Sequence, residues 1–185
     1  MKRLFISILL CPILLFYPFQ LMAGKLKVTT GNSINLKKAY FAGGCFWCME
    51  ESFDKVKGVI KSTSGYSGGT VVNPTYEEVI YKDTGHVETI EIVYDPEKTS
   101  YKELLDVFWK NIDPFDKYGQ FCDKGKSYRS VAFFQNNQEK KLINQSIKKL
   151  EIRFNDKIST LVWKFDKFYK AEDYHQDYYQ KNFLR

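Results

Sequence analysis

Residues 39–56 read AYFAGGCFWCMEESFDKV, and this stretch organises the fold around it. Its first four residues are apolar or aromatic and predict a short buried strand. The Gly-Gly pair that follows predicts a turn, and the pattern from Cys45 to residue 56 predicts a helix. Cys45 therefore lies at the start of a helix, where free backbone N–H groups and the helix dipole stabilise an anion. A thiol there is expected to be a nucleophile with a pKa below its ordinary value of about 8.5.

The residues after Cys45 predict the rest of a small redox site. Phe46 and Trp47 lie at the exposed start of the helix, and because both cannot point into the core we expect them to line an apolar pocket. Cys48 is one helical turn from Cys45, close enough to form a disulfide with an oxidised sulfur. A C-x-x-C pair also occurs among zinc ligands and by chance, so the spacing alone leaves those alternatives open.

Outside this stretch, strand and helix patterns alternate. Strands are predicted at 59–64, 86–94, 130–134 and 158–165, and helices at 75–81, 101–111, 137–154 and 171–183. This order predicts an α+β fold, a ferredoxin-like βαββαβ two-layer sandwich with extra elements.

Length and composition indicate one compact enzyme domain. The chain has 185 residues, of which 44% are hydrophobic and 17% aromatic, enough for a substantial core. The net charge of +6 falls to +4 without Lys2 and Arg3, with 26 basic and 22 acidic residues remaining. A charge this small and dispersed argues against a nucleic-acid partner, and we expect a monomer.

The N-terminal residues have the pattern of a targeting segment. A basic start, an apolar run interrupted by Pro12 and Pro18, and the residues LMA at 21–23 predict a signal peptide over residues 1–23. Polar residues 24–37 predict a linker, and 38–185 the enzyme domain. We therefore expect an exported protein, periplasmic or membrane-anchored and facing outside the cytoplasm. Without the leader three cysteines remain, an odd number that predicts at least one thiol outside any permanent disulfide.

Six short motifs follow one another in a fixed order along residues 38–182. They are FAGGCFWC (41–48), GYSGG (65–69), NPTY (73–76), GHVE (85–88), FCD (121–123) and YRS (128–130). Together they resemble the A-type peptide methionine sulfoxide reductase family. The resemblance implies an α+β architecture and reduction of methionine-S-sulfoxide, in proteins and also as the free amino acid, to methionine.

Reduction of a sulfoxide needs a soft nucleophile and a proton for the departing oxygen. Cys45 fits the first role. Glu88 lies on a predicted strand face with Ile90, Ile92 and Tyr94, and a carboxyl among apolar side chains has a raised pKa and can hold a proton. Periodicity alone fits a solvent-exposed glutamate equally well, and the resemblance assigns the acid to Glu88.

The resemblance also implies roles for side chains that carry no signal of their own. Tyr76 and Tyr128 are expected to donate hydrogen bonds to the sulfoxide oxygen, and Asp123 to organise water and the thiol. Phe46 and Trp47 are expected to receive the methyl group on sulfur, for which an aromatic environment is suitable.

Attack on the sulfoxide leaves a sulfenic acid on Cys45, which a second thiol must condense with. Many family members carry glycine at the position of Cys48 and keep recycling cysteines in a Gly-rich C-terminal tail, which this sequence lacks. The resolving thiol is therefore expected to be Cys48, one turn away, with Cys122 as the alternative and a relay through both possible. A thioredoxin-like dithiol would then reduce the disulfide.

Two other classes of function stay open from the residues alone. A general thiol-disulfide oxidoreductase would use the same C-x-x-C, but the sequence has no recognisable thioredoxin-like cis-proline context. A peptide-binding or zinc-stabilised module is the other class. His86 and His175 do not form a second paired-ligand motif with the cysteines, so neither a metal nor another cofactor is expected.

Overall fold

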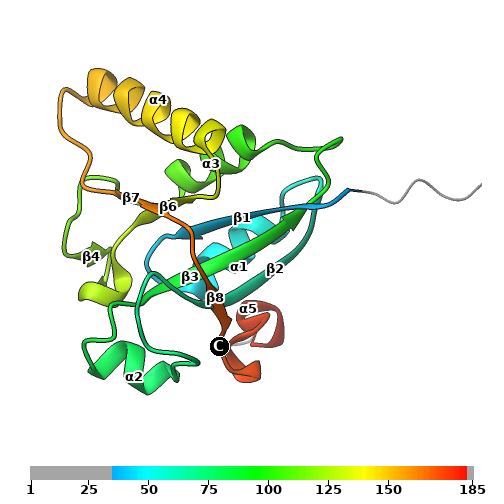
Figure 1. Cartoon of the computed structure of the whole chain (residues 1–185), viewed down its shortest axis with the longest axis vertical. Coiled ribbons are helices and arrows are strands. Elements are labelled where there is room, and N and C mark those ends of the chain that lie inside the picture. Colours follow the sequence, from blue (N-terminus) through cyan, green and yellow to red (C-terminus); the bar gives the residue numbers. More distant parts are fainter. Residues whose placement is uncertain (1–34, 183–185) are drawn as a thin grey trace, which may run out of the picture. The chain divides into compact units, whose positions relative to one another are not determined.

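The computed structural model describes residues 35–182 (Figure 1). The predicted signal peptide, residues 1–23, and most of the predicted linker, residues 24–37, lie outside the described residues. Within the described part of the chain, no helix has both the length and the apolar character needed to span a membrane.

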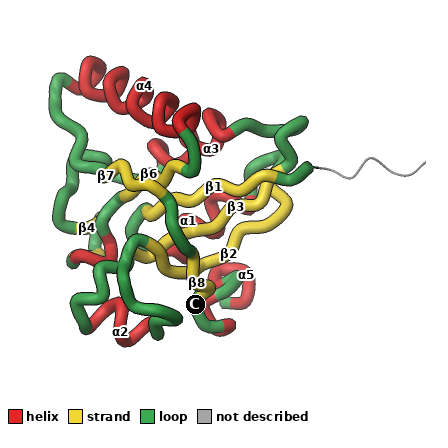
Figure 2. The backbone as a smooth tube through the Cα atoms, in the orientation of Figure 1, coloured by secondary structure: helices red, strands yellow, loops and turns green. Residues whose placement is uncertain are grey.

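A six-stranded sheet is the centre of the described fold (Figure 2). Its strands are ordered β7-β6-β1-β3-β2-β8, and every neighbouring pair is antiparallel except β6 and β7, which are parallel. Their bounds are β1 Lys37–Ala42, β2 Val59–Ser67, β3 Val87–Tyr94, β6 Val131–Phe134, β7 Leu161–Lys164 and β8 Phe168–Lys170. A separate hairpin joins β4, Gly119–Gln120, to β5, Asp123–Lys124.

Five α-helices and two 3₁₀ turns accompany these strands in the described residues. The helices are α1 Phe46–Asp54, α2 Tyr76–Tyr81, α3 Tyr101–Lys110, α4 Asn137–Phe154 and α5 Tyr178–Lys181; the 3₁₀ turns are Lys126–Tyr128 and Asp173–His175. Thr75 and Ser100 begin α2 and α3 with capping boxes, in which each side chain and a glutamate three residues on satisfy free N–H groups. The predicted α+β class is confirmed.

The two faces of the sheet are covered differently. On one face, Phe41 and Ile90 pack in a single buried cluster with Phe53 of α1, Phe108 of α3 and Ile143 of α4. The other face is covered largely by the chain that runs from β7 to β8, the two outer strands of the sheet. There the ring of Phe165 stacks on that of Tyr40 with centroids 3.7 Å apart.

The register of β1 and β3 positions the candidate acid. Phe41 lies opposite Ile90 in this antiparallel pair. Glu88 is on the same face of β3 as Ile90, two residues away, and so lies level with the turn that follows β1. That turn leads directly into α1, and Glu88 therefore faces the start of the helix that follows Cys45.

The C-terminal segment differs most from the sequence prediction. A continuous helix was predicted over residues 171–183, but the structure has a 3₁₀ turn and the short α5, separated at Asp177, which is left-handed with φ 53°. The break arises from long-range contacts: the Gln176 side chain donates to the Ser64 carbonyl, and the Asp177 N–H donates to the Glu50 carboxylate. The strand β8 and the β4–β5 hairpin were not predicted.

Candidate active site

Cys45 is the N-cap residue of α1, directly before the first helical position. Gly44 precedes it with φ +78°, and a Cβ atom on this residue would lie 2.5 Å from the Cβ of Gln120. Glycine is therefore required for the close approach of the β4–β5 hairpin to the start of the helix. The Cys45 side chain is half-buried, Cys48 and Cys122 are exposed, and all three thiols are free.

Glu88 is buried, with 2% of its surface exposed, and its Oε2 accepts a 2.9 Å hydrogen bond from the backbone N–H of Phe46. Burial, with a smaller contribution from the charge of Asp123, raises the pKa of Glu88 to about 8 against the opposing effect of the Phe46 N–H. Glu88 is unlike Glu91 on the same strand, which is paired with Lys38 at 2.9 Å. A carboxyl with this pKa holds a proton at neutral pH beside the residue that follows Cys45.

The thiols of Cys45 and Cys48 titrate as a pair. A hydrogen bond from Cys45 is the largest cause that lowers the pKa of Cys48, to about 6. The same bond, followed by burial, raises the pKa of Cys45. The low pKa that the helix start predicted for Cys45 alone is therefore replaced by coupled titration of two neighbouring thiols.

The phenols of Tyr76 and Tyr128 lie close enough for each to influence the pKa of the other. Tyr76 is the first residue of α2 and Tyr128 ends the 3₁₀ turn 126–128, so two separate segments meet here. Burial raises the pKa of both phenols, and the charge of Glu88 raises both further. The two tyrosines are therefore neutral hydrogen-bond donors near the Glu88 carboxyl.

Phe46 and Trp47 line different parts of the site. Phe46 is buried, whereas Trp47 is half-buried, and their ring centroids are 6.2 Å apart. The Phe46 ring lies 6.5 Å from that of Tyr76. Of the two rings predicted to line an apolar pocket, Phe46 therefore lies inside the core and Trp47 at its edge.

Asp123 and Cys122 belong to the β4–β5 hairpin beside the start of α1. Gln120 anchors the hairpin through 2.7 and 2.8 Å hydrogen bonds with the backbone N–H and carbonyl of Asp113. The charge of Asp123 raises the pKa of both Glu88 and Tyr128, which places this carboxylate near the other candidate residues. The structure thus brings Asp123 to the site and leaves Cys122 on the exposed outer surface of the hairpin.

Comparison with known proteins assigns the chain to a family. The family model described as peptide methionine sulfoxide reductase matches residues 37–185. The chain belongs to the peptide methionine sulfoxide reductase family. A relative from Streptococcus uberis, peptide methionine sulfoxide reductase MsrA, is 46% identical over 149 residues, covering 80% of this chain and 88% of that protein.

Solved structures agree with this assignment. The reduced form of Mxr1 from Saccharomyces cerevisiae aligns with a TM-score of 0.76 and 29% identity, covering 81% of this chain and 87% of that chain. Mxr1 in complex with Trx2 aligns with a TM-score of 0.55 and 22% identity over 82% of this chain and 91% of that chain, a likeness of fold alone.

This member of the family has site residues that the sequence reasoning missed, all from the C-terminal segment. The indole N–H of Trp47 donates to Nδ1 of His175 at 3.2 Å, and the Tyr178 ring stacks on Trp47 with centroids 3.7 Å apart. The carboxylate of Glu172 accepts the backbone N–H of Tyr76 at 2.9 Å. Their only signal in the sequence is an aromatic-rich run, which does not show that the segment folds back over α1.

His86, by contrast, has a structural role. Its Nδ1 accepts the Gly69 N–H at 3.1 Å, and its Nε2 is 2.8 Å from the Val71 carbonyl, so both ring nitrogens are occupied by backbone groups. Over residues 35–182, no group of three or more potential ligands is arranged to hold a metal ion.

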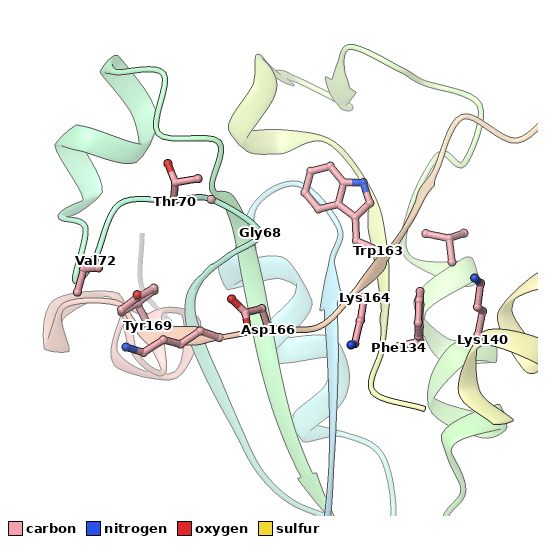
Figure 3. A pocket seen from close by; sticks show the side chains of 12 residues that line it. Gly68, Thr70, Val72, Phe134, Lys140, Trp163, Lys164, Asp166 and Tyr169 are labelled. Atoms are coloured by element: carbon pink, nitrogen blue, oxygen red, sulfur yellow. The ribbon is translucent and has the colours of Figure 1, made fainter. Parts of the chain in front are cut away.

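A groove of about 670 Å³ lies elsewhere on the protein (Figure 3). Trp163 and Phe134 line it together with the side chains of Lys140, Lys164 and Tyr169. None of its lining residues belongs to the candidate active site, so this groove is not where the reactive groups converge.

Proposed function

We propose that this protein reduces methionine-S-sulfoxide, in proteins and as the free amino acid, to methionine through a sulfenic acid on Cys45. The observation that carries the proposal is the buried Glu88 carboxyl, 2.9 Å from the Phe46 N–H at the start of the helix that Cys45 caps. A proton donor and a thiol nucleophile side by side are what the reaction requires. Family membership supports the same reaction.

The chemical step assigns each side chain a task. The Cys45 thiolate attacks the sulfoxide sulfur while Glu88 protonates the oxygen, with Tyr76 and Tyr128 donating hydrogen bonds to it. The oxygen is transferred to Cys45 as a sulfenic acid, and reduced methionine leaves. We assign the methyl group on sulfur to the pocket beside Phe46 and Trp47, and to Asp123 the ordering of water near the thiol.

Recycling of the enzyme uses a second thiol. We assign this role to Cys48, which is exposed, lies one helical turn from Cys45 and titrates together with it. Cys122, exposed on the hairpin, is the alternative. The resulting disulfide is then reduced by a thioredoxin-like dithiol, and the existence of a complex of Mxr1 with Trx2 supports a partner of this kind.

A single-turnover assay tests this function. Reduced protein is mixed with one equivalent of a methionine sulfoxide peptide, and methionine is measured by chromatography. Cys45→Ser should form no methionine, whereas Cys48→Ser should form one equivalent in the first turnover because only the later step needs Cys48. Methionine formed by Cys45→Ser would contradict the mechanism.

We also propose that residues 38–185 form one catalytic domain with a ferredoxin-like βαββαβ core. Its support is the antiparallel order β6-β1-β3-β2, with α1 between β1 and β2 in the sequence and α3 between β3 and β6. The remaining helices and strands are then the extra elements. We further propose that the enzyme acts as a monomer.

The location of the enzyme is a separate proposal. Residues 1–23 have the basic start, apolar run and small final residue of a signal peptide, with residues 24–37 as the linker. We therefore place the enzyme outside the cytoplasm, periplasmic or membrane-anchored, where it would repair oxidised methionines on exported proteins.

A further inference from the structure

The helix α5 lies beside the start of α1, and one of its side chains reaches Cys48. The Tyr179 hydroxyl is 3.4 Å from the Cys48 Sγ, within hydrogen-bonding distance for sulfur. We propose that Tyr179 is a positioning residue for the recycling step, holding Cys48 so that its sulfur attacks the sulfenic acid on Cys45. This inference rests on the proposed function, because it concerns the step that follows sulfoxide reduction.

Contacts that do not involve Cys48 fix α5 in place. The Asp177 N–H donates a 2.8 Å hydrogen bond to Oε2 of Glu50, a carboxyl of α1 with 2% of its surface exposed. The next residue, Tyr178, stacks on Trp47 with an interplanar angle of 7°. Because these contacts hold the two residues immediately before Tyr179, the fold sets the position of the Tyr179 hydroxyl independently of the thiols.

Opposing electrostatic effects act on the Cys48 sulfur. The carboxylates of Asp123 and Glu51 disfavour a thiolate there, whereas the hydrogen bonds from Cys45 and then Tyr179 favour it. The charge of Cys48 in turn raises the pKa of Glu88, the carboxyl that approaches from β3. When Cys48 is a thiolate it can only accept, so the Tyr179 hydroxyl is then its donor from outside α1.

The recycling step joins the two sulfurs and needs no outside oxidant. The Cys48 thiolate attacks the Cys45 sulfur, the sulfur–oxygen bond breaks, and hydroxide leaves with the proton that Cys48 has lost, forming water. Cys48 is oxidised and the sulfenic sulfur is reduced. A hydrogen bond from Tyr179 keeps the attacking sulfur charged and restricts its rotation before the attack.

Tyr179→Phe removes only the hydroxyl and should leave the first equivalent of methionine unchanged. Loss of the donor raises the pKa of Cys48, and each unit of increase lowers the thiolate fraction about tenfold at acid pH. For the same one-unit increase in pKa, each Cys48 thiolate of the variant is about threefold more nucleophilic than that of the parent, at all pH values. The ratio of variant to parent disulfide-formation rates should therefore increase about tenfold from pH 5 to pH 9 for a one-unit shift.

The assay mixes reduced protein with one equivalent of sulfoxide peptide, stops the reaction with a thiol-alkylating reagent, and quantifies the Cys45–Cys48 disulfide by peptide mapping. Tyr81→Phe is the matched control, since it removes an exposed hydroxyl on α2 and should keep the ratio at one. Gln180→Ala is the control for a general loosening of α5. It removes the 3.1 Å hydrogen bond from α5 to Asp54 but keeps the Tyr179 hydroxyl, so it should lower the rate of disulfide formation by the same factor at every pH.

A second readout is independent of sulfoxide chemistry. The rate at which iodoacetamide alkylates Cys48 in the intact reduced protein, followed against pH, should have its inflection at higher pH in Tyr179→Phe. An unmoved inflection, or a variant-to-parent ratio that is constant across pH, overturns the role of Tyr179. If the parent protein itself forms no methionine, the proposed function fails, while the alkylation profile still decides the role of Tyr179.

Discussion

Replacing Glu88 by glutamine removes the acidic proton while keeping the shape of the side chain. Glutamine keeps the length of the side chain and an oxygen that can accept the Phe46 N–H, but it has no acidic proton. General acid catalysis contributes about 10²–10⁴-fold, which corresponds to about 3–5 kcal/mol in the barrier. The chemical step of Glu88→Gln should slow by that factor.

The pH dependence of the same variant tests whether Glu88 acts as the acid. With a pKa of about 8, the parent carboxyl is mostly protonated at neutral pH, and the single-turnover rate should fall about tenfold per unit above pH 8. This alkaline decrease should be absent in Glu88→Gln. Rapid-quench measurement of methionine from pH 6 to 10 provides the comparison, and a variant with the parental rate and pH profile would refute the assignment.

The stability of the protein should also fall with rising pH, but over a lower pH range than the activity. The native pKa of Glu88 is about 8 against an ordinary 4.5, so between these values the folded protein keeps a proton that the unfolded chain has lost. The contribution of Glu88 to stability is complete below pH 4.5 and is lost as pH rises to about 8, by at most about 1.4 kcal/mol per pH unit. Glu88→Gln lacks this loss. Its melting temperature should therefore increase relative to the parent from pH 5 to pH 8, and parallel melting curves would contradict the raised pKa.

Two further predictions concern recycling and location. Cys48→Ser should stop turnover with a thioredoxin-like reductant but retain turnover with dithiothreitol, which reaches the sulfenic acid directly. Cys122→Ser should recycle normally. A Cys45–Cys122 disulfide in peptide maps of the oxidised parent would transfer the resolving role to Cys122. The protein purified from its native membrane and soluble fractions should begin near Gly24 or be anchored outside the cytoplasm, and an intact Met1 on a soluble cytoplasmic form, found by mass spectrometry, would contradict export.

Local rules in the sequence account for the placement of the nucleophile. The Gly-Gly turn and the apolar pattern around it predicted a helix start at Cys45, and the structure has Cys45 as the N-cap of α1. This succeeded because turn geometry and helix initiation depend on neighbouring residues. The period-two pattern likewise placed Glu88 on the face of Ile90, but periodicity could not show whether that face was covered at residue 88.

The sequence by itself determined the α+β class, the redox pair at the start of a helix, and the motifs of the family. Only the tertiary structure decided the burial of Glu88, the contact between Cys48 and Tyr179, and the path of the C-terminal segment. The predicted helix at 171–183 is broken because Asp177 donates to Glu50, 127 positions earlier in the chain. Contacts across such separations depend on how the elements pack, and no local pattern encodes them.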